Sequence, residues 1–155
     1  VVSFDLDPAA VERNYRRVRS EKESGILPLL LDLTNPSPGQ GWGGGERLSL
    51  EERGPADVVL ALALVHHLAI GHNLPLPRIA AYLSRLGRRL IIEFVPKSDS
   101  QVKRLLVSRP DIFPEYTREG FEAAFSQYYH IRSSDPVVDS ERRVYHMQAR
   151  GAGGA

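Results

Sequence analysis

Cysteine is absent from the 155-residue chain, which excludes disulfide bonds and thiolate metal sites. An excess of charge is also absent, since 20 Lys and Arg side chains balance 19 Asp and Glu side chains. The chain therefore has no overall basic field of the kind that attracts nucleic acid or anionic membranes. No apolar run approaches the roughly 20 residues that span a bilayer, and the start lacks the order of a signal peptide. We expect a cytoplasmic protein that binds neither nucleic acid nor membranes.

The composition is that of one ordinary globular domain. Hydrophobic residues make up 42% of the chain and charged residues 25%, and the length suffices for one core but not comfortably for two. We expect residues 1–150 to form this domain. The Gly- and Ala-rich end, residues 151–155, is predicted to be a disordered tail.

Apolar runs that end in a polar or acidic residue alternate with helical patterns. The runs predict strands at 1–7, 26–33, 57–65 and 88–95. Helices are predicted at 8–24, 79–86, 100–107 and 117–128, and two closing strands at 129–134 and 142–149. The first helix has a strong start, with Asp7 as its cap and Pro8 in its first turn. This order predicts an α/β fold with a mostly parallel sheet and a C-terminal antiparallel hairpin.

Two short motifs between the second and third predicted strands are weak evidence for a binding site. A literal G-x-G-x-x-G spans residues 39–44, but a dinucleotide fingerprint must leave a strand and open a helix directly. Here Pro36 and Pro38 intervene, which favours a loop, with Trp42 as an apolar contact if the loop covers a ligand. The Asn35–Pro38 segment is best interpreted as a proline-stiffened turn.

Two acidic residues stand at strand ends separated by one helix. Asp5 ends the first predicted strand and Asp32 the second. A carboxylate at the carboxyl edge of a parallel sheet can accept hydrogen bonds from ribose hydroxyls, and a neighbouring one from an adenine amine. Taken singly, each residue is as easily a turn residue or a solvated strand end. The ordered pair favours nucleoside binding.

Two histidines, His66 and His67, follow the strand predicted at 57–65. Adjacent side chains on an extended segment point to opposite faces, so the two imidazoles are not expected to chelate one metal ion. A histidine at a strand's carboxyl end can act as a general base, because its ordinary pKa lies near operating pH. We place this role on His66, and expect His67 mainly to pack and cap the following turn.

Glu93 lies near the end of the strand predicted at 88–95 and is a further catalytic candidate. Its carboxylate either faces the same cleft or is satisfied by Lys97 or by a backbone donor.

Together these segments resemble the class I S-adenosylmethionine-dependent methyltransferases, which have a Rossmann-like fold, and most closely a bacterial nodulation-protein-like group. The resemblance covers nearly the whole chain and is carried chiefly by Asp32–Pro38, Leu62–Ile70 and Leu90–Val102. The Val65–Leu68 element recurs in many methyltransferases, whereas Glu93–Ser100 is distinctive.

The resemblance implies S-adenosylmethionine as the cofactor. It implies that Asp5, with Leu6 beside it, binds the ribose, and that Asp32 and the backbone of Leu33 bind the adenine. The resemblance also implies that Ala61 and Leu62 lie against the methionine part of the cofactor. His66 and His67 would then lie near the transferred methyl group. The expected partner is a small-molecule or protein methyl acceptor, and a homodimer is the oligomer considered.

The family's first strand and its glycine-rich turn have no counterpart in these residues. In the family that strand lies between the strand ending at Asp5 and the one ending near Val65. We therefore interpret the chain as a partial methyltransferase domain, truncated at its N-terminus. The alternatives are a non-catalytic Rossmann-like binding or scaffold module and, less favoured, a dinucleotide enzyme.

Overall fold

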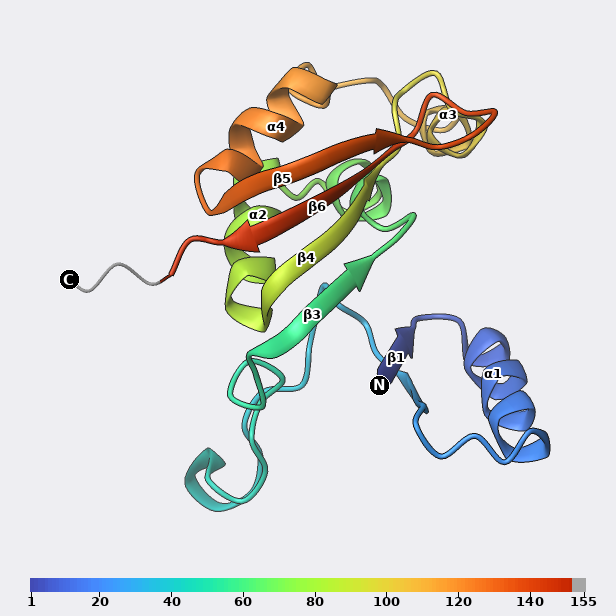
Figure 1. Cartoon of the computed structure of the whole chain (residues 1–155), viewed down its shortest axis with the longest axis vertical. Helices are drawn as coiled ribbons and strands as arrows, with labels where there is room; N and C mark the ends of the chain where they lie inside the picture. The colour runs from blue at the N-terminus through green and yellow to red at the C-terminus, as the bar shows by residue number, and fades with distance from the viewer. Residues whose placement is uncertain (152–155) are drawn as a thin grey trace. The chain divides into compact units, whose positions relative to one another are not determined.

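The computed structural model describes residues 1–151, which form two compact units, Val1–Ser49 and the residues from Leu50 onward (Figure 1). The first unit contains β1 (Val2–Asp5), α1 (Pro8–Ser20), β2 (Leu27–Leu30) and a short 3₁₀ turn, η1 (Trp42–Gly44). The elements of the second unit are β3 (Ala56–Ala61), a π-helical turn η2 (His67–Gly71), α2 (Leu76–Leu86), β4 (Gly87–Phe94), α3 (Ser100–Leu106), α4 (Arg118–Ser126), β5 (Tyr129–Pro136) and β6 (Arg143–Ala149). Residues 152–155 of the predicted tail lie outside the described part.

The first unit is a single β–α–β element. β1 and β2 pair in parallel, with Val2 beside Leu27 and Asp5 beside Leu30. α1 connects them and therefore runs back from the carboxyl edge of the pair. Its N-terminus lies at that edge, which is where parallel α/β structures bind ligands.

The start of α1 is formed as the sequence predicts. Asp7 is extended (φ −81°, ψ 111°), its carboxylate accepts from the Ala9 backbone N–H at 2.9 Å, and Pro8 follows. The helix ends at Ser20 rather than 24, because the chain turns through Lys22, whose φ is +51°.

Loss of this cap gives a direct stability test. We expect Asp7→Ala to lower the free energy of unfolding by about 1 kcal/mol, the usual cost of a lost N-cap. Asp5→Ala, two residues earlier and outside the helix, is the matched control and is expected to cost less than half as much. Urea denaturation of both variants measures the difference; a larger loss in Asp5→Ala would contradict the capping assignment.

The second unit is a four-stranded sheet in the order β3-β4-β6-β5. β3 and β4 are parallel, whereas β6 is antiparallel to both β4 and β5. α2 and α4 contact each other and pack on one face of the sheet, as Figure 1 shows. Alternate residues of β4 and β6 fill this core: Leu90, Ile92, Phe94, Tyr145 and Met147 are at most 3% exposed.

An aromatic cluster joins α4 to this sheet. The Phe121 ring lies 5.1 Å from Phe94, 4.3 Å from Phe125 and 5.1 Å from Tyr145, measured between ring centroids. α4 itself begins at the cap that the sequence predicts, since Thr117 Oγ1 accepts from the Gly120 N–H at 3.0 Å.

The α/β fold class and the C-terminal hairpin are confirmed, but the expected mostly parallel sheet is wrong. In residues 1–151 two strand pairs are parallel and two antiparallel, and they belong to two separate sheets. The reason is that β6 lies between β4 and β5 and is antiparallel to both, so the second sheet has one parallel pair and two antiparallel pairs.

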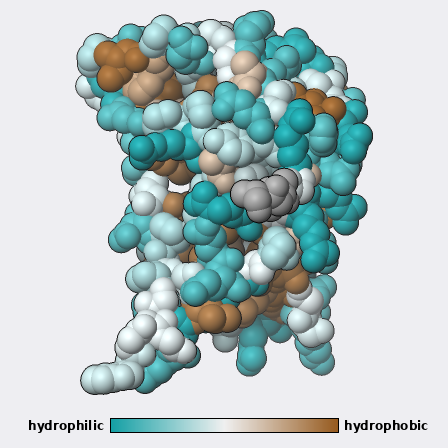
Figure 2. Space-filling view, turned by 90° about the vertical axis from the view of Figure 1, so that its left-hand side faces the viewer, coloured by the Kyte–Doolittle hydropathy of each residue, from teal (hydrophilic) through white to brown (hydrophobic). Residues whose placement is uncertain are grey.

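Large apolar side chains are exposed in both units, and Figure 2 shows apolar areas between polar ones on one face of the molecule. Among the large apolar residues on strands, the most exposed is Leu30 in the first unit, at 57%, and Leu60 in the second, at 63%. None of the helices in residues 1–151 has the length and apolar character needed to cross a membrane.

Candidate functional site

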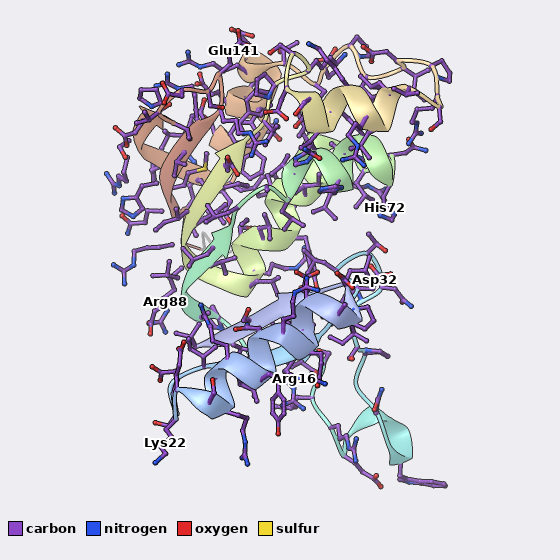
Figure 3. The ribbon with its side chains drawn as sticks, turned by 90° about the vertical axis from the view of Figure 1, so that its right-hand side faces the viewer. Arg16, Lys22, Asp32, His72, Arg88 and Glu141 are labelled. Carbon is purple, nitrogen blue, oxygen red and sulfur yellow. The ribbon has the colours of Figure 1, made fainter. Side chains whose placement is uncertain are left out.

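In the first unit the two predicted acidic residues lie at one edge. Asp5 is the last residue of β1, and Asp32 follows the end of β2 by two residues. The parallel register places Asp5 beside Leu30, and the Leu31 N–H donates to the Asp5 carbonyl at 3.0 Å. Figure 3 shows Asp32 at the end of this unit opposite Lys22, which follows the C-terminus of α1. The pair expected to bind a nucleoside is therefore assembled on one edge.

Both carboxylates also make local turn contacts. Asp5 Oδ1 accepts from the Asp7 N–H at 2.9 Å. Asp32 Oδ1 accepts from the Thr34 N–H at 2.8 Å and from the Thr34 hydroxyl at 2.6 Å. The turn role and the ligand role are compatible, because a carboxylate has about four acceptor positions. Leu6 is exposed and Leu33 half-buried beside them.

In the second unit, the sequence places the end of the third strand too late. β3 ends at Ala61, which is 2% exposed, and not at residue 65. Leu62 follows with 56% of its surface exposed, and Ala63 then adopts a left-handed backbone with φ +50°. A left-handed residue cannot continue a strand, so the chain leaves the sheet here.

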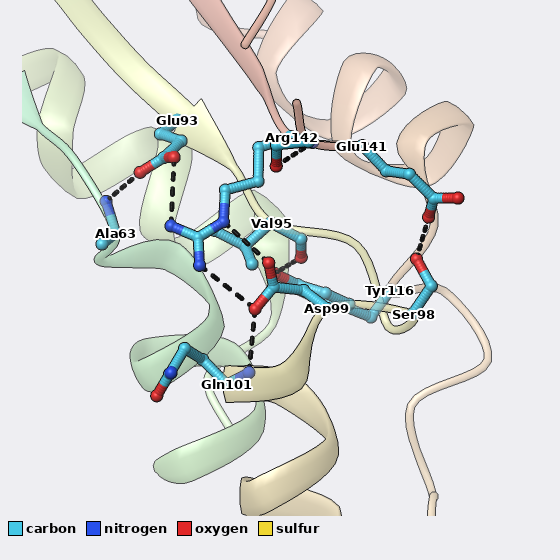
Figure 4. Close-up of polar contacts among 10 residues, drawn as sticks. Ala63, Glu93, Val95, Ser98, Asp99, Gln101, Tyr116, Glu141 and Arg142 are labelled. Carbon is cyan, nitrogen blue, oxygen red and sulfur yellow. Dashed lines mark hydrogen bonds and ion pairs between the residues drawn. The ribbon is translucent and has the colours of Figure 1, made fainter. Parts of the chain in front are cut away.

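A buried ionic network lies where β4 ends (Figure 4). Glu93 is 8% exposed; its Oε2 accepts from the Ala63 N–H at 2.7 Å, and its Oε1 lies 3.3 Å from Arg142 Nη1. Arg142 also holds Asp99 with two hydrogen bonds, from Nε to Oδ2 at 2.8 Å and from Nη2 to Oδ1 at 3.1 Å. The backbone-donor alternative for Glu93 is therefore the observed one, while Lys97 pairs with Asp111.

Asp99 ties this network to a helix. Its Oδ1 accepts from the Gln101 N–H at 2.8 Å, which makes Asp99 the N-cap of α3. Hydrogen bonding from Arg142 holds the pKa of the Asp99 carboxyl below its ordinary value, against the opposing effect of burial. The network thus joins the ends of β3 and β4, the start of α3 and the connection from β5 to β6.

The two histidines do not lie on an extended segment, which corrects the prediction that they point to opposite faces. His66 is helical (φ −66°, ψ −32°) and begins the turn that continues as η2. On a helical turn adjacent side chains diverge less than on a strand, and the two rings lie 4.2 Å apart between centroids. Within residues 1–151 no group of three or more ligand-type side chains could hold a metal ion.

The burial of the two histidines differs sharply. His66 is 1% exposed, and neither ring nitrogen has a hydrogen-bond partner among the described residues. Burial lowers the pKa of His66 to about 4, assisted by the nearby His67 and Arg142 and opposed by Asp99. His67, in contrast, is exposed. The residue chosen as the base is therefore inside the protein, and its neighbour is at the surface.

Sequence reasoning missed three members of the network. Asp99 carried a usable signal, because an Asp before Ser100 and an apolar helical pattern is a typical N-cap. Arg142 carried none, since its partners are 43 and 49 residues away. The left-handed Ala63 was equally hidden, because alanine has no preference for that backbone conformation.

A shallow polar hollow of about 350 Å³ adjoins the network. It is lined by Ser98, Asp99, Lys103, Asp139, Ser140 and Glu141. Its lining is polar, with three carboxylates, one lysine and two serines, unlike the apolar walls of ordinary small-molecule pockets.

The chain is similar to a nodulation protein in sequence and to a solved structure in fold. The chain is 45% identical over 145 residues to nodulation protein NoeA of Rhizobium meliloti (strain 1021), an alignment that covers 93% of this chain and 30% of that protein. The chain thus spans less than a third of the length of this relative. No protein-family model matches the sequence.

The crystal structure of PH0226 protein from Pyrococcus horikoshii OT3 has a similar fold. Its TM-score is 0.62, over 97% of this chain and 71% of that chain, at 12% sequence identity. At this identity the likeness shows the fold alone. Over most of its length the chain is therefore homologous to part of NoeA, on an α/β fold that also occurs in PH0226.

Proposed function

We propose that the chain is part of an S-adenosylmethionine-dependent methyltransferase. The observation that carries the proposal is that each unit presents its candidate residues at the carboxyl end of parallel strands. In the first unit these are Asp5 and Asp32, and in the second they are Leu62 and Glu93. Ligands of open α/β sheets bind at this edge. The homology to NoeA over 93% of the chain agrees with the nodulation-protein-like resemblance of the sequence.

The first unit fits the adenosine half of this cofactor. Asp5 is exposed at the end of β1, and Asp32 is half-buried beyond β2. We assign the ribose hydroxyls to Asp5, with Leu6 beside it, and the adenine to Asp32 and the Leu33 backbone. For the methionine part, the family resemblance of the sequence implies Ala61 and Leu62.

The cofactor's sulfonium supplies the methyl group, so the chain's own residues have to orient the acceptor and, for a hydroxyl or ammonium, take up one proton. His66, His67 and Glu93 remain the candidates. His67 has the advantage of exposure, whereas His66 has almost none. The proposed acceptor is a small molecule or a protein, and a homodimer, a cytoplasmic location and the absence of nucleic-acid binding stay predictions.

A second candidate is a non-catalytic binding or scaffold module. The burial of His66 favours it, because a side chain that is 1% exposed cannot reach an acceptor without movement of the turn.

Ligand titration followed by amide NMR separates these functions. We expect S-adenosylhomocysteine to shift the amide resonances of Leu6 and Leu33 among others, with a Kd of about 1 mM or weaker, because the 155 residues contain no counterpart of the family's glycine-rich turn. Asp5→Ala should abolish the shifts, since a hydrogen bond to a charged partner is worth about 1.5–3 kcal/mol. Asp7→Ala, the matched control, should keep them.

No shift at either position up to 10 mM ligand, roughly ten times the expected Kd, would favour the scaffold module. Micromolar binding would instead contradict the expectation that the glycine-rich turn is needed. An effect of Asp7→Ala in place of Asp5→Ala would move the ribose ligand by two residues.

A further inference from the structure

The turn after β3 has a backbone conformation that alanine does not favour. Ala63 has φ +50°, in the left-handed region that side chains with a Cβ rarely adopt. Such a conformation persists only where surrounding groups hold it. The question is therefore which group holds Ala63.

Glu93 is placed to do so. The β3–β4 register pairs Ala61 with Ile92, so Glu93 lies next to the residues that follow Ala61. Its Oε2 accepts from the Ala63 N–H at 2.7 Å, and a hydrogen bond from an amide to a carboxylate is among the stronger kinds in proteins. The contact joins residues 30 positions apart and fixes the left-handed turn to the next strand.

The other oxygen of Glu93 is also engaged. Oε1 lies 3.3 Å from Arg142 Nη1, and Arg142 is itself fixed by two hydrogen bonds to Asp99. The side chains are largely covered, with 24% of Arg142 and 11% of Glu93 exposed. A general base needs an oxygen within reach of the substrate proton. Both oxygens of Glu93 are instead committed to protein groups.

We propose that Glu93 is a positioning residue, which holds Ala63 in its left-handed conformation and so aims the Leu62–His67 segment. The helical turn begins just after Ala63, where the Leu64 carbonyl accepts from the His67 N–H at 3.0 Å. The direction of this turn decides where Leu62, His66 and His67 lie. The link to catalysis rests on the proposed function, which assigns this segment to the methionine part and the acceptor.

The proposal is tested on the 155-residue chain by hydrogen exchange and amide NMR without any ligand. Glu93→Gln removes the charge, and Glu93→Asp keeps the charge but is too short by one methylene to reach Ala63 while paired with Arg142. In both variants we expect the Ala63 amide to exchange about tenfold faster and its proton resonance to move upfield. Glu119→Gln, an exposed carboxylate of α4, is the control and should change neither.

A rescue experiment separates positioning from general support of the fold. In Glu93→Asp the His67 amide, which donates to the Leu64 carbonyl inside the turn, should also exchange faster. Glycine adopts a positive φ without steric cost, so Ala63→Gly added to Glu93→Asp should restore exchange at His67 to within about threefold of the parent chain, because the turn no longer needs to be held. The amide of residue 63 should stay fast, since its acceptor is still out of reach. If Glu93→Gln does not fold, the Glu93→Asp pair decides the matter. Unchanged exchange at Ala63 in Glu93→Asp, or no rescue by Ala63→Gly, would overturn the proposal.

Titration with S-adenosylhomocysteine adds the functional arm. We expect Glu93→Asp to weaken the ligand-induced shift at the Leu62 amide and Ala63→Gly to restore it. If the ligand-induced shift at the Leu62 amide is the same in Glu93→Asp as in the parent chain, Glu93 does not position the site. If the parent chain shows no response to ligand anywhere, the proposed function fails, while the exchange result still decides whether Glu93 holds the turn.

Discussion

Arg142→Met is expected to lower the free energy of unfolding by about 3 kcal/mol at pH 7. The substitution leaves Glu93 and Asp99 without their shared cation, although both carboxylates are largely covered, with 11% and 14% of their side chains exposed. Breaking a buried ion pair from one side typically costs about 3–5 kcal/mol, and the partial exposure of Arg142 places the expectation at the lower end. Urea denaturation measures the loss.

The loss should depend on pH in a defined direction. Arg142 lowers the pKa of Asp99 in the folded state below its ordinary value. A carboxyl whose folded pKa is lowered contributes stability above its unfolded pKa, near about 3.9, and loses it as the pH falls through the folded pKa. The difference in the free energy of unfolding between the parent chain and Arg142→Met is therefore largest at neutral pH and becomes smaller below about pH 4.

Arg132→Met serves as the matched control. Arg132 is exposed on β5, and its guanidinium donates to the neutral Gln148 side chain. We expect its replacement to cost less than about 0.5 kcal/mol at every pH, as for other exposed positions. A loss in Arg142→Met no larger than in Arg132→Met would show that the network carries little of the stability of the second unit.

The elements of this fold were predictable where local patterns decide them. Asp7 and Thr117 cap the helices that the sequence predicts, and the closing hairpin pairs as expected. Two expectations, the end of β3 and the mostly parallel sheet, failed because contacts distant in the sequence decide them. β3 stops at Ala61 since Glu93, 30 residues beyond Ala63, stabilises a turn there. β6 lies between β4 and β5, which gives the second sheet two antiparallel pairs.

The candidate site divides in the same way. Asp5 and Asp32 were found because a strand end is visible in the sequence and parallel strands bring such ends to one edge. Arg142 could not be found, because nothing near residues 139–142 indicates that a cation is needed at the end of β4. The assignment of His66 assumed an extended strand end; one left-handed residue, Ala63, was enough to turn that position into the core.

His66 should make the folded state lose stability at pH values well above those at which ordinary carboxyl groups titrate. Burial, with the neighbouring charges of His67 and Arg142, lowers its folded pKa to about 4, against about 6.5 in the unfolded chain. The unfolded state therefore binds this proton first as the pH falls. Stability is unaffected by His66 above about pH 6.5 and is lost between about pH 6.5 and 4, by about 3 kcal/mol in total.

His66→Leu is expected to remove this pH dependence of the free energy of unfolding. Because neither ring nitrogen of His66 has a partner among the described residues, an apolar side chain of similar size should leave stability at pH 7 unchanged or slightly higher. Between pH 7 and 4 the parent chain should then lose about 3 kcal/mol more than the variant, measured by urea denaturation at each pH. His146→Leu, at an exposed position of β6, should follow the parent chain.

The same measurement decides which histidine is left for catalysis. If His66→Leu removes the pH dependence of the free energy of unfolding, His66 stays neutral and enclosed at operating pH. Proton uptake from the acceptor then falls to the exposed His67. Equal slopes in the parent chain and His66→Leu would mean that the His66 ring exchanges protons with solvent as an ordinary imidazole does. The turn after Ala63 would then open readily in solution, and His66 would return as the first candidate for the base.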